Sequence, residues 1–101
     1  MITLKQIDYA LAVSKTLHFK KAAEASFVSP STLSNAITEM EKHLGFKVFE
    51  RDNKKVFVTA LGAEFLKKAQ SIQLQIFDIQ KLVENQSDPL SSSLSIGIIP
   101  T

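Results

Sequence analysis

The chain has 101 residues, of which 45% are hydrophobic and 22% charged, with a net charge of +2 and no cysteine. This length allows one small domain with an appendage. The lack of cysteine excludes disulfides, thiolate catalysis and cysteine-based zinc sites within the chain. The sequence shows neither an apolar run of membrane-spanning length nor a signal-peptide pattern, so we expect a cytoplasmic protein with no membrane partner.

The charge is unevenly distributed along the chain. Residues 1–68 hold eleven Lys and Arg residues against seven Asp and Glu, a net +4, whereas residues 69–101 hold one against three, a net −2. A basic front and an acidic back favour a nucleic-acid-binding module followed by a different segment. A net +4 also lies within the range of an ordinary soluble surface, so this asymmetry alone does not decide the function.

The first predicted helix opens with a capping box. Thr3 and Gln6 have the Thr-x-x-Gln spacing, and the helix should run to about Ser14. We expect its buried face to consist of Leu4, Ile7 and Leu11, with Ala10 and Ser14 at its edge.

A second, short helix is predicted from Phe19 to about Ala25. His18 suits its N-cap better than a ligand or general-base role, because no second histidine lies at metal-ligand spacing. The small residues Ala22 and Ala23 would allow another backbone to approach closely. After them, the apolar pair Phe27-Val28 is expected to anchor a short turn.

The third predicted helix has clear ends and one apolar stripe. Ser29 suits the N-cap, Pro30 suits the first helical position, and Gly45 supplies the stop. The apolar stripe recurs at spacings of four, three and four through Leu33, Ile37, Met40 and Leu44.

The opposite side of this helix is polar but slim in its first half. Its residues are short, uncharged and able to form hydrogen bonds, namely Ser31, Thr32, Ser34, Asn35 and Thr38. Such a front suits insertion into the DNA major groove, although a Ser/Thr-rich surface helix would show the same pattern. With the preceding short helix and turn, residues from about 19 to 44 form a predicted helix-turn-helix.

A β-hairpin, the predicted wing, should span residues 46–59. Two β-prone runs, 46–51 and 55–59, flank the turn-forming stretch 52–54, and the buried side should carry Val48, Phe49, Val56 and Val58. We expect the cationic residues Arg51, Lys54 and Lys55 to cluster at the tip, where they could contact phosphates or the minor groove. The alternative is an ordinary solvated turn.

Residues 60–85 are predicted to form one long helix capped by Thr59. Its apolar positions follow one another at spacings of 4, 3, 4, 3 and 4, which is typical of a coiled-coil seam: Phe65, Ala69, Ile72, Ile76, Ile79 and Val83. A further set, Leu61, Leu66, Leu74 and Leu82, is expected to widen the stripe and pack on the domain's own core. The exposed seam requires a partner, and the simplest is a second copy in a two-fold dimer.

The last residues differ in character from the helix. Residues 86–93 are polar and should form a hinge. Residues 94–101 have the pattern of a first strand, and since a lone strand does not fold independently, we expect them to be the truncated start of a further domain.

Taken together, these elements are similar to the N-terminal DNA-binding region of LysR-type transcriptional regulators. The resemblance spans nearly the whole chain and is carried by Leu4, Ile7, Ala22-Ala23-Glu24, Val28-Ser29, Thr32-Leu33-Ser34, Ile37, Met40-Glu41, Leu44-Gly45, Val48-Phe49-Glu50-Arg51, Val56, Val58-Thr59 and Gly62. Within the family, His18-Phe19, Ala22–Ala25 and the tail 96–101 resemble OxyR-type, peroxide-responsive activators.

One departure from the family falls at the start of the third helix. The family usually has Ser-Gln-Pro there, whereas this chain has Ser29-Pro30-Ser31. Pro30 therefore replaces a glutamine that could form hydrogen bonds with a base edge, and it offers only apolar contact, for example to a thymine methyl. The docking mode can carry over while the preferred DNA sequence differs.

The sequence therefore predicts a mainly α fold, with a winged helix-turn-helix domain at 1–59 followed by a coiled-coil linker helix, and a chain that binds double-stranded DNA as a homodimer on a pseudo-palindromic operator. The residues expected to contact DNA are Pro30, Ser31, Thr32, Ser34, Asn35, Thr38, Arg51, Lys54, Lys55, Lys20 and Lys21. The resemblance implies that the intact protein is often a tetramer and meets a small-molecule or redox effector only through a C-terminal domain beyond this chain.

Two functions other than DNA binding are alternatives for this chain. A coiled-coil interaction module, with the helix-turn-helix as an end cap, would dimerise without sequence-specific DNA binding. An enzyme would require a nucleophile–base pair, a phosphate loop or a metal constellation, none of which the sequence contains. We therefore expect no catalytic residues, no metal and no cofactor in this chain.

Overall fold

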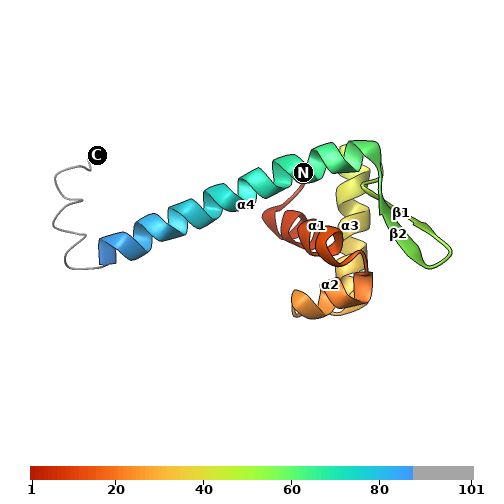
Figure 1. Cartoon of the computed structure of the whole chain (residues 1–101), viewed down its shortest axis with the longest axis horizontal. Helices are drawn as coiled ribbons and strands as arrows, with labels where there is room; N and C mark the ends of the chain where they lie inside the picture. Colours follow the sequence, from red (N-terminus) through yellow and green to blue (C-terminus); the bar gives the residue numbers. More distant parts are fainter. Residues whose placement is uncertain (88–101) are drawn as a thin grey trace. The chain divides into compact units, whose positions relative to one another are not determined.

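The computed structural model describes residues 1–87 and contains four helices and one two-stranded sheet within that range (Figure 1). In chain order the elements are α1 (Leu4–Thr16), α2 (Phe19–Ala25), α3 (Pro30–Leu44), β1 (Phe49–Asp52), β2 (Lys55–Val58) and α4 (Ala60–Ser87). The mainly α, winged helix-turn-helix fold with a long final helix is confirmed. Residues Met1–Gln70 form one compact unit, and a second begins at Ser71 within α4.

Helix α1 begins with the predicted capping box and is buried over a wider arc than predicted. The Thr3 hydroxyl accepts from the Gln6 amide at 3.1 Å, and the Gln6 side chain accepts from the Thr3 amide at 2.9 Å. Leu4 was expected inside but is 55% exposed, whereas Tyr9 and Val13 are buried. The reason is that α1 packs against both α2 and α3, so more than one side of the helix is covered.

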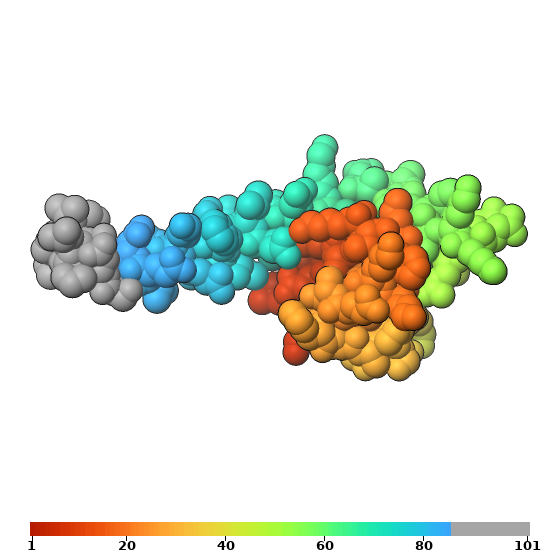
Figure 2. Space-filling model, turned by 60° about the horizontal axis from the view of Figure 1, so that its bottom comes forward, coloured from red at the N-terminus to blue at the C-terminus, as the bar shows by residue number. Residues whose placement is uncertain are grey.

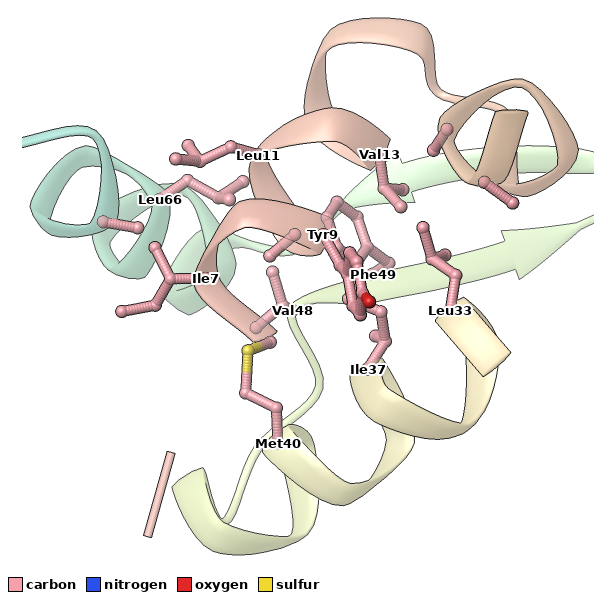
Figure 3. Close-up of a cluster of buried hydrophobic side chains, with 14 residues drawn as sticks. Ile7, Tyr9, Leu11, Val13, Leu33, Ile37, Met40, Val48, Phe49 and Leu66 are labelled. Carbon is pink, nitrogen blue, oxygen red and sulfur yellow. The ribbon is translucent and has the colours of Figure 1, made fainter. Parts of the chain in front are cut away.

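The core of the first compact unit forms where α1, α3, β1 and the first turns of α4 meet. In Figure 3 the side chains of Ile7 and Leu11 from α1, Met40 from α3, Phe49 from the wing and Leu66 from α4 point into one cluster. All five are less than 10% exposed. This shared core fixes α3 against the wing, since both elements contribute side chains to it.

The α2–turn–α3 segment has the predicted caps. The His18 ring accepts from the Lys21 amide at 3.2 Å at the start of α2, and the Ser29 hydroxyl accepts from the Thr32 amide at 3.2 Å at the start of α3. The turn differs from the prediction at one residue. Val28 packs against the core, but Phe27 is 94% exposed and has a left-handed backbone with φ of 59°.

The wing is a short antiparallel hairpin in which Phe49 pairs with Val58 and Arg51 pairs with Val56. Its turn residues Asn53 and Lys54 both have positive φ, at 49° and 69°. Two consecutive left-handed residues are the mark of a type I′ turn, which matches the natural twist of a hairpin.

A carboxylate joins α3 to the base of the wing. One oxygen of Glu41 accepts hydrogen bonds from the Val48 amide at 2.8 Å and from the Phe49 amide at 3.1 Å. Val48 directly precedes β1 and Phe49 is its first residue. The link therefore fixes the end of α3 to the start of the hairpin.

Thr59 and Gly62 connect the wing to α4. The Thr59 hydroxyl donates to the Lys47 carbonyl at 2.6 Å and accepts from the Gly62 amide at 2.9 Å, which is the predicted cap of α4. A Cβ atom on Gly62 would overlap the Val48 carbonyl oxygen and lie 2.8 Å from the Thr59 hydroxyl oxygen. Only glycine fits at this approach of helix to hairpin.

The apolar residues of α4 divide between the core and the surface differently from the prediction. Ala69 was expected in the dimer seam but is 1% exposed, and Phe65 also packs against the core. Leu66 packs inward as expected, whereas three leucines expected to do the same are more than half exposed, namely Leu61, Leu74 and Leu82. The exposed part of the seam therefore starts at Ile72.

Helix α4 ends two residues later than predicted, at Ser87. The rest of the expected hinge, 88–93, and the expected strand 94–101 lie outside the described residues. Within residues 1–87, no helix is long and apolar enough to cross a membrane.

Candidate nucleic-acid interface

The polar front of α3 is exposed as predicted. Ser34 is half-buried, and the other five predicted base-contacting residues of this helix are exposed: Pro30, Ser31, Thr32, Asn35 and Thr38. On the opposite side Leu33, Ile37 and Met40 are buried. The apolar stripe thus holds the helix in the core while its slim side faces solvent.

The hydroxyls at the start of α3 form a small network. The Ser29 hydroxyl donates to the Thr32 hydroxyl at 2.8 Å and lies 3.2 Å from the Ser31 hydroxyl. One turn later, the Thr38 hydroxyl donates to the Ser34 carbonyl at 3.0 Å. In this arrangement Thr32 keeps its own hydrogen to donate, whereas Thr38 offers an acceptor and a methyl group.

Arg51 lines the same hollow as Lys54 and Lys55, as the predicted cluster requires, but it lies in a strand of the wing and not in its turn. It belongs to β1, on the same face of the strand as the buried Phe49, because residues two apart in a strand point the same way. Its guanidinium carbon lies 3.9 Å from the centre of the Phe19 ring, and its Nη2 donates to the Ser34 hydroxyl at 3.5 Å. Arg51 therefore sits between the wing, α2 and α3, and only Lys54 and Lys55 are at the tip.

Two hollows flank Arg51. The first, of about 380 Å³, lies between α3 and the wing and includes Ser34, Thr38 and Glu41 in its lining. The second, of about 220 Å³, lies between the start of α2 and the hairpin and includes Lys20, Lys54 and Lys55. Phe19 and Arg51 line both hollows, so their side chains form the boundary between them.

The second hollow brings together four cationic residues, one of which is distant in sequence from the other three. Lys20 from α2 joins Arg51, Lys54 and Lys55 from the wing. Figure 2 shows the green wing beside the surface that α1 and α2 form in red and orange. Lys21 is exposed but lines neither of these hollows, so the structure does not bring it into this group.

None of these four cationic residues is in an ion pair within the described part of the chain. Surface ion pairs elsewhere join Lys42 to Glu39 at 3.6 Å and Lys47 to Glu50 at 4.0 Å. Lys20, Arg51, Lys54 and Lys55 thus carry positive charge without an ion-pair partner, and Arg51 among them contacts α3 through Ser34. This combination suits a nucleic acid, whose backbone carries negative phosphates and whose base edges carry hydrogen-bonding groups.

Phe19 and Glu41 also belong to this site, although neither was predicted as a site residue. Phe19 contacts Arg51 and also meets Phe49 edge to face, with ring centres 6.1 Å apart and ring planes at 80°. Glu41 holds the wing through backbone amides. The aromatic residue directly after the His18 cap was a visible signal, but only the fold shows that it faces Arg51.

The described residues contain no group of three or more His, Cys, Asp and Glu side chains placed to hold a metal ion. His18 is used as a helix cap, and the Nδ1 atom of His43 lies 3.2 Å from the amino group of Met1.

Residues 4–63 match the family described as bacterial regulatory helix-turn-helix protein, lysR family. The chain belongs to the LysR family. The predicted identity as the N-terminal DNA-binding region of a LysR-type regulator is thereby confirmed, and the match covers α1, the helix-turn-helix, the wing and the first turn of α4.

Two curated relatives of this LysR-family chain illustrate its similarities. It is 41% identical over 99 residues to the HTH-type transcriptional regulator EstR of Acinetobacter baylyi, and 30% identical over 100 residues to the transcriptional dual regulator OxyR of Escherichia coli. The matches cover 98% and 99% of this chain but 33% of each relative. The predicted similarity to OxyR-type proteins is confirmed, and the chain spans about a third of the length of these relatives.

Solved structures share the fold. A full-length OxyR from Pseudomonas aeruginosa matches 83% of this chain and 28% of its own, with a TM-score of 0.79 and 32% identity. The DNA-binding domain of CbnR, solved as a DNA complex, matches 84% of this chain and 98% of its own, with a TM-score of 0.76 and 24% identity.

Proposed function

We propose that this LysR-family chain binds double-stranded DNA sequence-specifically, as a homodimer on a pseudo-palindromic operator. The observation that carries the proposal is the exposed, uncharged front of α3 beside four cationic residues without ion-pair partners. Membership of a family of regulatory helix-turn-helix proteins supports it, as do the DNA complexes of CbnR and BenM domains with the same fold.

In this proposal α3 enters the major groove with its N-terminal half nearest the bases. Asn35 is the side chain best suited to a bidentate contact, since an amide matches the N6 and N7 edge of adenine. Pro30 offers apolar contact to a thymine methyl. Thr32 can donate to base acceptors and Thr38 can accept from base amino groups, as their internal hydrogen bonds leave these groups free.

The cationic residues contact the DNA backbone in this proposal. Lys54 and Lys55 at the wing tip and Lys20 on α2 line one hollow, so they can neutralise neighbouring phosphates. Lys21, which lies outside that hollow, remains a proposed phosphate contact on the exposed side of α2. These contacts set the position of the domain, and the side chains of α3 supply the sequence preference.

Dimerisation is proposed to use the exposed stretch of the α4 seam. Ile72, Ile79 and Val83 are 39%, 59% and 64% exposed, and Ile76 continues the same stripe. A row of aliphatic residues at this spacing packs most simply against its own copy. Tetramer formation and the effector response are proposed for the part of the protein beyond this chain.

The test is selection of binding sites from a randomised duplex pool with this chain, followed by binding measurements across a salt series. Enrichment of a two-fold-symmetric site would support the proposal. Salt-sensitive binding without enrichment would restrict the chain to phosphate contacts. An absence of binding even at low salt would favour the coiled-coil interaction module instead.

Asn35→Ala tests the assignment of the recognition front. We expect it to weaken binding to the selected operator by about 1–3 kcal/mol and to relax preference at one base pair, because the amide's base contact is lost. Asn85→Ala, at an exposed position near the end of α4, is the matched control and should change neither property. If the unsubstituted chain, Asn35→Ala and Asn85→Ala bound the operator with equal affinity, Asn35 would not belong to the site.

A further inference from the structure

The contact between Phe19 and Arg51 joins α2 to the wing. Phe19 is the first residue of α2, and its ring lies under the Arg51 guanidinium at 3.9 Å. The same ring makes an edge-to-face contact with Phe49, which belongs to β1 as Arg51 does. The guanidinium also reaches the Ser34 hydroxyl of α3. Arg51 is therefore held by α2 and α3 although it belongs to the wing.

This arrangement leaves the charge of Arg51 available. No carboxylate among the described residues forms an ion pair with it, and the residue is exposed. One of its five N–H donors is directed to Ser34, so the remaining edge of the guanidinium plane is free to bind an anion. An arginine stacked on an aromatic ring loses less side-chain freedom on binding than an unrestrained one.

We propose that Phe19 is a positioning residue for DNA binding, which holds the Arg51 guanidinium at the junction of α3 and the wing so that both elements meet the DNA backbone as one unit. The inference rests on the proposed DNA-binding function. It accounts for the position of the two side chains on the boundary between the α3 hollow and the cationic hollow. Phe19 itself acts through Arg51 and makes no DNA contact.

The test measures operator affinity of the full chain across a salt series for substitutions at both residues. Phe19→Leu removes the aromatic face and keeps an apolar side chain, so affinity should fall about fivefold while the salt dependence stays unchanged. Arg51→Gln should lower affinity and reduce the slope of log affinity against log salt by about 0.9, the value of one phosphate. In the Arg51→Gln background, Phe19→Leu should have no further effect on affinity.

Two controls separate positioning from general damage to the fold. Phe19→Tyr keeps the ring face and should bind like the unsubstituted chain. Phe57→Leu makes the same replacement in β2, where the phenylalanine is 48% exposed and pairs with Glu50, and it should leave affinity unchanged. Arg51→Lys keeps the charge but not the planar stacking group, so affinity should fall while the salt slope stays unchanged. This variant tests the inference even if Phe19→Leu does not fold.

Equal affinity of Phe19→Leu and Phe57→Leu would overturn the inference, as would a full additional loss from Phe19→Leu in the Arg51→Gln background. In both cases the unsubstituted chain still binds its operator, so the proposed function stands. Failure of the unsubstituted chain to bind any duplex would overturn the function and the inference together.

Discussion

At the scale of single residues, Phe27 is the least expected side chain in the structure. It is 94% exposed and holds a left-handed backbone with φ of 59°, a conformation that costs a residue with a Cβ atom about 1–2 kcal/mol. Neither burial nor local geometry explains a phenylalanine there. A hydrophobic pair in the sequence predicted an anchor, but only Val28 of the pair packs inward.

Replacing Phe27 by glycine should stabilise the fold. Glycine adopts positive φ without steric cost, so Phe27→Gly should raise the free energy of unfolding by about 1 kcal/mol, after allowing for the greater freedom of glycine in the unfolded chain. Phe27→Ala removes the exposed ring but keeps the backbone cost, and it should be less stable than the glycine variant. Urea unfolding measures the difference, and equal stabilities would show that φ is not the cause.

Glu41 should contribute more to stability than its neighbour Glu39. Glu41→Gln keeps one neutral acceptor for the Val48 and Phe49 amides but loses the charge, so we expect a loss of about 1 kcal/mol in the free energy of unfolding. Glu39 only pairs with Lys42 on an exposed surface, and Glu39→Gln should change stability by less than about 0.5 kcal/mol. Similar values for both variants in urea unfolding would contradict the role of Glu41 as a link to the wing.

Some residue positions were not predictable because their environment depends on several elements at once. Tyr9 and Val13 lie outside the single stripe that periodicity identifies in α1, yet they are buried because both α2 and α3 cover this helix. Arg51 was predicted to cluster with Lys54 and Lys55, and it does line one hollow with them, because the three are close in sequence. Its contacts with Phe19 and Ser34 arise only when three elements are folded together.

At the scale of elements, the ends of helices were the most predictable features. The bounds of α2 and α3 match the sequence prediction, because His18, Ser29 and Gly45 act through local backbone geometry. The position of the hairpin also followed from local signals, namely β-prone runs around a turn. What local signals could not supply was the connection between elements, such as the approach of α4 to the wing at Gly62.

Gly62→Ala tests this approach. Alanine favours a helix over glycine by about 1 kcal/mol, yet we expect the substitution to destabilise the chain by about 1–3 kcal/mol, because its Cβ would meet the Val48 carbonyl and the Thr59 hydroxyl. Ala63→Gly at the neighbouring exposed position is the control. It should destabilise the chain only by the difference in helix propensity between alanine and glycine. Thermal unfolding of both variants measures whether position 62 is more stable with glycine and position 63 with alanine. If Gly62→Ala stabilised the chain, the wing would be able to move away from the added Cβ atom.

At the scale of the whole molecule, α4 carries the proposed dimer contact. The prediction of a long apolar seam was partly wrong in position, because Phe65 and Ala69 serve the core of their own unit. Periodicity identifies an apolar stripe but does not say which part of it the chain covers itself. The structure moves the proposed dimer contact toward Ile72 and the residues after it.

Ile79→Asp and Leu74→Asp form a matched pair for testing the dimer. Both side chains are 59% exposed, and five helical residues place them about 140° apart around α4. We expect Ile79→Asp to weaken dimerisation at least tenfold, because a carboxylate would be buried in the seam, whereas Leu74→Asp should leave it unchanged. Sedimentation equilibrium measures both, and equal effects would show that the dimer does not use this face.

In the turn of the wing, the residue that gives the most stable backbone is not the residue that best serves DNA binding. A type I′ turn is most comfortable with glycine at its second position, yet Lys54 occupies it at φ of 69° and lines the cationic hollow. Selection for thermal stability alone would favour glycine there, whereas selection for high affinity to an operator would favour lysine. A variant with glycine at position 54 should therefore be more heat-resistant but bind DNA more weakly. The weaker binding would come from the missing positive charge in the turn, since α3 is unchanged.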